Sequence, residues 1–417
     1  MPVTQSLMLA LAVVVTIPTA YILVLVLAAF LFRRKTDSEA PPLRLTVVVP
    51  AHNEEQQIAA TVKSLLATSY SPDSREIIVI ADNCDDRTAE EARQAGATAI
   101  ERTDLEERGK GQALNWLFTQ HSDLWQDSDG VVIVDADTLV CKAFLSELSA
   151  SLSHPDVSAV QGFYGVANPR DSWRTALSAA ALAVFHHIRP AGRNVIGGTA
   201  GFKGNGLALR TQLIVQYGWP AFSIVEDIEF SLLLLLDDIL VHYNPAAVVY
   251  GEMATTGSQA SSQRMRWEGG RLALLKQYLP PLAERFLETG KLACLDGIFE
   301  LMVPPLSLLV GAQLAVGLAA ALLCPWGTAW LLGCLATMAA YVSAGLLLHR
   351  EPPIVWLSLL AAPIFIAWKI PLYAIMALQG PAKHWHRTQR KAEMPEHLDR
   401  SEPGNTDGND SDRNTSM

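Results

Sequence analysis

The sequence has few of the residues that build disulfide frameworks or nucleic-acid surfaces. Five of its 417 residues are cysteine, and they show neither close pairing nor the spacing of a metal site. They are therefore expected to be reduced thiols in or facing a cytosol. The 32 lysine and arginine residues are outnumbered by 42 aspartate and glutamate residues, so a nucleic-acid partner is not indicated.

The chain also lacks an internal repeat of fixed period. A transporter built from structural repeats is therefore not supported, although the chain has several apolar stretches. Residues 381–417 lack such stretches: they are polar, and the part after Pro395 is rich in Ser, Asn, Asp and Gly. That composition predicts a disordered tail.

An almost uninterrupted apolar run extends from Leu7 to Phe32 and ends in Arg33-Arg34-Lys35. A bilayer is crossed by about 20 apolar residues, and the run is too long for the core of a signal peptide. Residues 1–35 are therefore predicted to form a retained transmembrane helix. The basic cluster places the following residues on the cytoplasmic side of the cell membrane.

Three more apolar stretches lie within residues 291–380, at Ile298–Leu323, Trp330–Leu348 and Ile354–Leu378. Three crossings after a cytoplasmic domain would leave the tail outside, yet the basic residues that follow them favour a cytoplasmic tail. One stretch is therefore expected to be re-entrant or interfacial, and the sequence does not decide which. Prolines that could break or kink the first and third stretches are Pro304, Pro305 and Pro371.

Residues 44–290 have mixed polarity and alternate between strand-like and helix-like patterns. This alternation predicts an α/β domain with a parallel, doubly wound, Rossmann-like sheet. The expected strands are Leu45–Val49, Glu76–Ile80, Thr98–Ile100 and Val131–Val134, and the expected helices are Glu55–Thr68, Arg87–Ala95 and Gly111–Gln120.

Two carboxylates, Asp135 and Asp137, follow the buried strand Val131–Val134 at once. Open α/β sheets bind ligands outside the carboxyl ends of their strands. Hard oxygen ligands at such a place suit Mg²⁺ or Mn²⁺, which could in turn hold a diphosphate. A turn with solvated acids is the alternative.

Polar residues at other strand ends and at one helix start could complete a nucleotide-sugar site. Asp82 follows a strand and can accept from a base N–H, and Glu54 lies on the same rim, where the alternative is an acid favoured by the dipole of a helix start. Gly109-Lys110-Gly111 supplies a flexible turn with one mobile cation, which suits a diphosphate. A P-loop is excluded, because its longer glycine spacing and its Ser or Thr after lysine are absent.

Taken in order, these motifs resemble the family-2 glycosyltransferases of the GT-A fold. They are most similar to the membrane-integrated branch that contains cellulose, chitin, hyaluronan and poly-N-acetylglucosamine synthases. The resemblance covers residues 45–280. It is carried by Pro50–Glu55, Asp82–Asp86, Arg108–Asn115, Asp135–Asp137, Gly204–Gly206, Val225–Asp227 and Gln263–Trp267.

The resemblance assigns roles to the acids. Asp82 would hold the nucleobase, and Asp135 would lean toward the nucleotide. Asp137 would bind the divalent ion, with Asp135 assisting. Asp227 would be the general base of an inverting transfer, although Glu226 and Glu229 are near enough in sequence to compete for that role. The motif has Val225 where the synthases have threonine, which removes a supporting hydrogen bond and leaves the carboxylate.

The last motif, Gln263-Arg264-Met265-Arg266-Trp267, would contact the acceptor and the diphosphate. In the synthases the tryptophan forms the floor under the acceptor sugar, with Glu226 and Gln263 expected nearby. Arg266 can fork onto phosphate. An interfacial helix with Trp267 at the membrane surface is the alternative, and both can hold.

The sequence thus predicts a membrane-bound, metal-dependent, inverting hexosyltransferase. Its donor would be a UDP-sugar, with UDP-glucose and UDP-N-acetylglucosamine favoured, and its acceptor a growing polysaccharide. Transfer of a single sugar to a membrane lipid is the alternative, because few spans make a polymer channel hard to build. A nucleotide-sugar-binding pseudoenzyme is a remote one, since every expected acidic position is filled.

Overall fold

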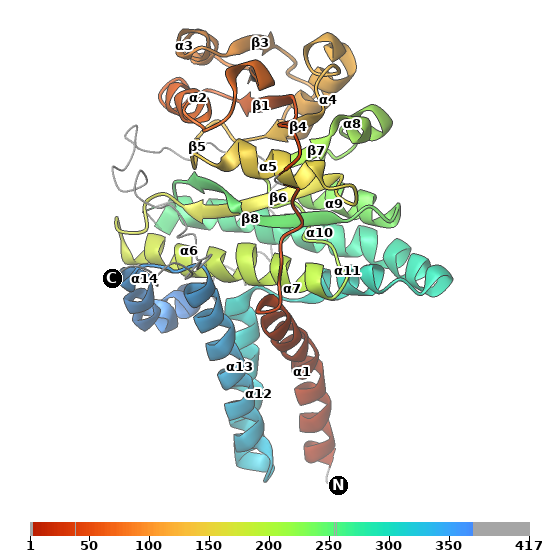
Figure 1. Cartoon of the computed structure of the whole chain (residues 1–417). Coiled ribbons are helices and arrows are strands. Elements are labelled where there is room, and N and C mark those ends of the chain that lie inside the picture. Colours follow the sequence, from red (N-terminus) through yellow and green to blue (C-terminus); the bar gives the residue numbers. More distant parts are fainter. Residues whose placement is uncertain (1–2, 38, 254, 256, 370–417) are drawn as a thin grey trace, which may run out of the picture.

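The computed structural model of the chain describes residues 3–37, 39–253, 255 and 257–369, with the backbone alone over residues 257–266. An α/β unit forms one end of the molecule, and three long helices extend from the other (Figure 1). A layer of helices that lie across the ends of these three separates them from the sheet.

One mixed sheet has the strand order β3-β2-β1-β4-β7-β6-β8-β5. Strands β3, β2, β1 and β4 pair in parallel, which confirms the prediction for this half. The bounds are β1 Leu45–Ala51, β2 Arg75–Asp82, β3 Thr98–Arg102, β4 Gly130–Ile133, β5 Thr138–Val140, β6 Ala159–Val166, β7 Leu207–Arg210 and β8 Val241–Gly251.

The second half departs from the expected parallel arrangement at β7 and β5, although β6 and β8 pair in parallel. Strand β7 runs antiparallel to both β4 and β6, and β5 runs antiparallel to β8. Strand β7 begins with Leu207 opposite Ile133, the last residue of β4. It therefore enters the sheet at the edge where β4 ends, and it can only run in the reverse direction.

Helices cover both faces of the sheet, as a doubly wound sheet requires. Along β1, Val48 packs on one face with Leu114 of α4, and Val47 packs on the other face with Ile58 and Val62 of α2. Side chains of a strand alternate between faces, so one strand serves two cores. The helices around the sheet are α2 Ile58–Leu66, α3 Thr88–Ala95, α4 Lys110–Gln120, α5 Phe144–Ser153, α8 Thr211–Tyr217 and α9 Glu226–Leu236.

Four helices form the layer between the sheet and the long apolar helices (Figure 1). A π-helical turn, Val184–Ile188, joins the first two of them. The four helices of this layer are α6 Trp173–Ala183, α7 Arg189–Val195, α10 Gly257–Thr289 and α11 Leu292–Met302.

Within the described part of the chain, three helices are long and apolar enough to cross a membrane: α1 Val3–Ala29, α12 Leu306–Leu323 and α13 Gly327–Leu348. They pack together through polar contacts in apolar surroundings. Gln313 of α12 donates to Thr19 of α1 over 2.8 Å, and the indole of Trp330 donates to Thr16 over 2.9 Å.

The predicted span Ile298–Leu323 is interrupted. Helix α11 ends at Met302 and α12 begins at Leu306. Pro304 and Pro305 lie between them, and proline lacks the N–H that a continuous helix needs. The part before the break lies across the ends of the long helices instead of extending along them (Figure 1).

The predicted third span, Ile354–Leu378, starts as the short helix α14 Pro353–Ser358 and continues as an apolar helix to Lys369, and this described part is shorter than a span. Residues 370–378 lie outside the described residues. Helix α14 packs against α6, beside the α/β unit. Helices α12 and α13 form a hairpin that returns the chain to the side of the sheet (Figure 1).

Candidate active site

One cavity of about 1450 Å³ extends from the carboxyl ends of β1, β2 and β4 to the long apolar helices α1, α12 and α13. It brings together every predicted site residue whose side chain is described. These are Glu54, Asp82, Lys110, Asp135, Asp137, Glu226, Asp227 and Trp267. The side chains of Gln263 and Arg266 lie outside the described residues.

Asp82, the last residue of β2, is held by a buried arginine that lies outside the predicted motifs. Arg102, the last residue of β3, lies opposite Asp82 in the strand register. Its guanidinium donates to Oδ1 of Asp82 over 2.7 Å and to Asp104 over 2.9 Å. This fork fixes the carboxylate at the rim of the cavity. An acid and an arginine at the ends of two neighbouring predicted strands were the signal that could have identified the pair.

Lys110 connects the two groups of acids. It is the first residue of α4, after Gly109 at φ +116°. Its ammonium lies 2.6 Å from Oδ1 of Asp135 and 3.7 Å from Oε1 of Glu226, and it also donates to the carbonyl of Gly204. Burial alone would lower the pKa of Lys110, but these carboxylates raise it above its ordinary value. Lys110 is thus a fixed cation in the centre of the site.

The turn Asp135–Asp137 is held from both sides. The backbone N–H of Asp135 donates to Asn205 over 3.1 Å, and the carbonyl of Ala136 accepts from Thr61 over 2.7 Å. Within the described part of the chain, no group of three or more His, Cys, Asp or Glu side chains could hold a metal ion. Two carboxylates on a fixed turn still fit Mg²⁺ or Mn²⁺, since such ions take one or two protein carboxylates together with substrate phosphates.

The three acids in the first turn of α9 have different environments. Both oxygens of Glu229 are engaged: Oε2 accepts from the backbone N–H of Phe222 and Ser223 over 3.1 and 2.9 Å, and Oε1 accepts from Tyr278 over 3.3 Å. Glu229 therefore shapes the loop before α9, and it does not line the cavity.

Glu226 and Asp227 line the cavity. Burial raises the pKa of Asp227 above its ordinary value, and burial raises that of Glu226 to about 7. A Cβ placed on Gly204 would lie 3.5 Å from Oδ2 of Asp227, so the glycine loop passes close to this carboxylate. A buried carboxylate of raised pKa beside open space is the environment of a general base.

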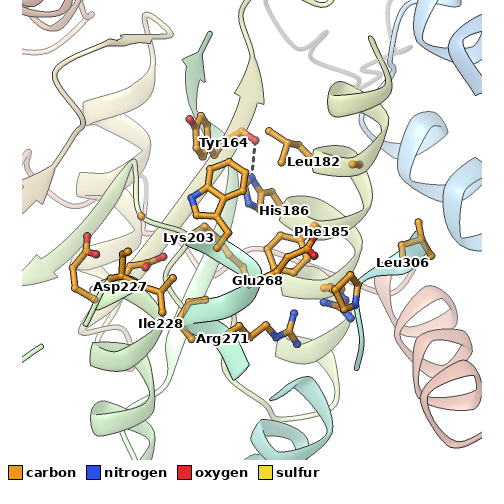
Figure 2. Close-up of a pocket in the computed structure, with 18 of the residues that line it drawn as sticks. Tyr164, Leu182, Phe185, His186, Lys203, Asp227, Ile228, Glu268, Arg271 and Leu306 are labelled. Atoms are coloured by element: carbon orange, nitrogen blue, oxygen red, sulfur yellow. Dashed lines mark hydrogen bonds between the residues drawn. The ribbon is translucent and has the colours of Figure 1, made fainter. Parts of the chain in front are cut away.

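Where the cavity approaches the long apolar helices, it contains charged residues that were not predicted as site residues. Figure 2 shows Lys203 and Arg271 between Asp227 and Leu306, the first residue of α12. Lys369, in the last described helix, is 4% exposed and lies 2.7 Å from Oε1 of Glu268. Arg271 and Glu268 fall just after the last motif, and no sequence pattern marked them.

Comparison with known proteins agrees with this geometry. A family model described as "Glycosyltransferase like family 2" matches residues 41–270. The probable glycosyltransferase YdaM of Bacillus subtilis is 26% identical over 254 residues, which cover 59% of this chain and 59% of that protein. The beta-monoglucosyldiacylglycerol synthase of Nostoc sp. is 30% identical over 235 residues, 54% of this chain and 48% of that one. The chain thus spans about half to three fifths of the length of these relatives.

Among solved structures, the mannosyltransferase PcManGT of Pyrobaculum calidifontis, in complex with GDP-Man and Mn²⁺, aligns with a TM-score of 0.54 at 21% identity. The alignment covers 90% of this chain and 99% of that one. At this identity the likeness establishes the fold alone, and it confirms the predicted GT-A architecture. Because the family model covers more than half of the sequence, the chain belongs to glycosyltransferase family 2.

Proposed function

We propose that the protein is a membrane-bound, inverting glycosyltransferase that moves one sugar from a UDP-sugar to a lipid acceptor. The observation that carries the proposal is the continuity of the cavity. Its walls run without interruption from Asp82 and Asp135, at the strand ends, to Met338 of α13 and Phe365 in the last described helix. A lipid whose chain lies along the apolar wall could therefore place its head group near the carboxylates.

The membrane half of the cavity has the lining that an acyl or prenyl chain needs. Its wall contains side chains from α1, α12, α13 and the last described helix, among them Ile22, Leu308, Val342 and Ile366. A chain that enters from the bilayer would exchange one apolar environment for another, so this lining could accept it without loss. That a relative is named as a synthase of monoglucosyldiacylglycerol supports the same acceptor class.

The proposed chemistry is a single displacement. The acceptor oxygen attacks the anomeric carbon, the bond from that carbon to the diphosphate breaks, and UDP leaves with the bonding electrons. Asp227 acts as the general base and takes the proton of the acceptor hydroxyl. Asp82 accepts a hydrogen bond from the nucleobase of the donor, and Lys110 contacts the diphosphate. Asp135 and Asp137 would hold Mg²⁺ or Mn²⁺, which when bound offsets negative charge on the leaving diphosphate.

A growing polysaccharide, the acceptor first expected from the sequence, stays as the second candidate. The observation that favours it is Trp267, which lines the same cavity as the carboxylates. An indole face suits the apolar C–H side of a pyranose. Only the product separates the two candidates.

The test is UDP release by the purified full-length protein with Mn²⁺, a panel of radiolabelled UDP-sugars and a panel of lipids. One organic-soluble product carrying a single sugar would support the lipid acceptor. A ladder of lengths would establish polymerisation instead. No release with any donor, although UDP binds, would contradict both and favour the nucleotide-sugar sensor.

Replacing Asp137 with asparagine is expected to lower kcat/KM by more than about 100-fold. Loss of residues that merely orient metal ligands already costs roughly 10–100-fold, and Asp137 is proposed to be a ligand itself. Calorimetry should show that UDP binding loses its dependence on Mn²⁺. The matched control is Asp73→Asn, an exposed acid outside the cavity. Unchanged Mn²⁺ dependence in the Asp137 variant would contradict the assignment.

The pH dependence of kcat/KM should reflect the titration of Asp227, the proposed general base. Since burial raises the pKa of Asp227, kcat/KM should rise with pH through an apparent pKa above the ordinary range of a carboxyl group. The charge of Lys110 lowers the pKa of Asp227, so Lys110→Met should shift this acid limb to higher pH. The exposed control Lys63→Met should leave it in place. An unmoved acid limb in the Lys110 variant would rule Asp227 out as the titrating group.

A further inference from the structure

Three basic side chains line the cavity where it approaches the long apolar helices, and a fourth is buried beside them. Two of the four are on α7, one is in the loop before β7, and one is on α10. We call Arg189, Arg193, Lys203 and Arg271 the basic cluster. Lys203 lines the cavity together with Arg189 and Arg271, and Arg193 lies one helical turn after Arg189 on α7.

Two carboxylates serve these four cations. Arg193 donates to Asp296 over 2.8 Å. Arg189 and Arg271 share Glu300, at 3.3 and 3.8 Å from its Oε1. The cluster therefore carries an excess of positive charge in buried surroundings, which is costly without an anion.

Two donors of the cluster have no acceptor. The Nε of Arg189 is buried and has no hydrogen-bond partner in the described part of the protein. The ammonium of Lys203 lies 4.5 Å from the centre of the Phe185 ring, and no carboxylate among the described residues is within ion-pair distance of it. Burial lowers the pKa of Lys203 to about 7. Both residues line the cavity, so a ligand in the cavity could supply the missing acceptors.

The cluster lies beside the last turns of α1, one of the helices long and apolar enough to cross a membrane. Helix α7 packs closely on α1, because a Cβ on Gly192 would lie 2.4 Å from the carbonyl oxygen of Leu25. Leu25 is in the last turns of α1, which ends at Ala29. A lipid that enters between the long helices would therefore bring its head group to the basic cluster and its chain to the apolar wall.

We propose that the basic cluster binds the phosphate of the acceptor, so that the acceptor class is a lipid whose head group carries a phosphate. This inference rests on the lipid acceptor proposed above. The diphosphate of the donor has its own cation, since Lys110 lies beside Asp135. Lys203 lies on the acceptor side, near enough that its charge lowers the pKa of Asp227. The attacking oxygen is then a hydroxyl beside the phosphate or an oxygen of the phosphate itself.

The test measures acceptor KM in nonionic detergent for three lipids: phosphatidylglycerol, a polyprenyl monophosphate and diacylglycerol. The first two separate a hydroxyl from a phosphate oxygen as the nucleophile. We expect at least one of them to have a KM about 10-fold or more below that of diacylglycerol. Lys203→Met should raise the KM for that lipid about 10–100-fold, leave the KM for the UDP-sugar within about 2-fold, and be largely rescued by Lys203→Arg.

Each other outcome is decisive. Equal use of diacylglycerol, with no effect of Lys203→Met on acceptor KM, would overturn the inference and leave the lipid glycosyltransferase standing. A raised KM for the UDP-sugar in Lys203→Met would assign the cluster to the donor. Binding of inorganic phosphate through Lys203, without selection among lipids, would assign it to a free anion. Failure of every lipid with donor turnover intact would refute the proposed function itself.

Discussion

Replacing Asp227 with asparagine is expected to lower sugar transfer by about 10²–10⁴-fold, the usual contribution of a general base. The carboxylate is buried in the first turn of α9, beside the open cavity and the close-packed Gly204. Its neighbour Glu229 is occupied by backbone N–H groups. Asparagine keeps the shape of the side chain and cannot take a proton from the acceptor.

The folded state should tolerate this change. A negative charge at a helix start is worth about 0.3–1 kcal/mol, and removal of a buried charge offsets part of that loss. Asp237→Asn is the matched control, because it makes the same change in an exposed residue directly after α9. Steady-state transfer and UDP affinity should be measured for both variants. Full activity of Asp227→Asn with intact UDP binding would move the base to Glu226.

The first half of the α/β unit could be predicted because each strand and helix there has a clear pattern in its own segment of the sequence. The predicted strand Glu76–Ile80 is part of β2 Arg75–Asp82, and the predicted helix Gly111–Gln120 is α4 without its first residue. Buried parallel strands are continuous apolar runs, and the connecting helices have their own period. The acids at strand ends then converge by geometry alone.

The second half could not be predicted in the same way, since strand direction depends on the path of the chain. The four residues of β7 are a short apolar segment that pairs antiparallel with β4, and no local pattern records which strand lies beside it. Lys203 escaped notice for a similar reason. Its role depends on Arg189 and Arg271, which come from other helices, so its charge acquires meaning only in three dimensions.

The same limit applies to the membrane part. Hydropathy identified the apolar stretches, and the proline pair marked the point where α11 and α12 separate. Hydropathy does not record that α11 carries Asp296 and Glu300 inward to the arginines of α7. These ion pairs join α11 to α7, and they account for the buried charges in an otherwise apolar stretch.

Replacing Asp296 with asparagine should therefore destabilise the protein by about 3–5 kcal/mol, the cost of leaving a buried charge without its partner. Arg193 and Asp296 have side chains that are 4% and 3% exposed, and they lie 2.8 Å apart. The other oxygen of Asp296 accepts from Tyr21 of α1 over 2.6 Å. The substitution would thus weaken the attachment of α1 to α7 and α11 together. The free energy of unfolding in detergent is the quantity to measure.

Asp238→Asn is the control, because it removes an acid that is also ion-paired but is exposed to solvent. Asp238 is 28% exposed and pairs with Arg285 and Lys291, which are 33% and 49% exposed. Exposed pairs contribute about 0–1 kcal/mol, and asparagine accepts the positive φ of this position. If both variants lost the same small amount, the buried pair would not hold α1. A large loss confined to Asp296→Asn, relieved when Arg193 is also replaced by methionine, would show that the unpaired arginine is its cause.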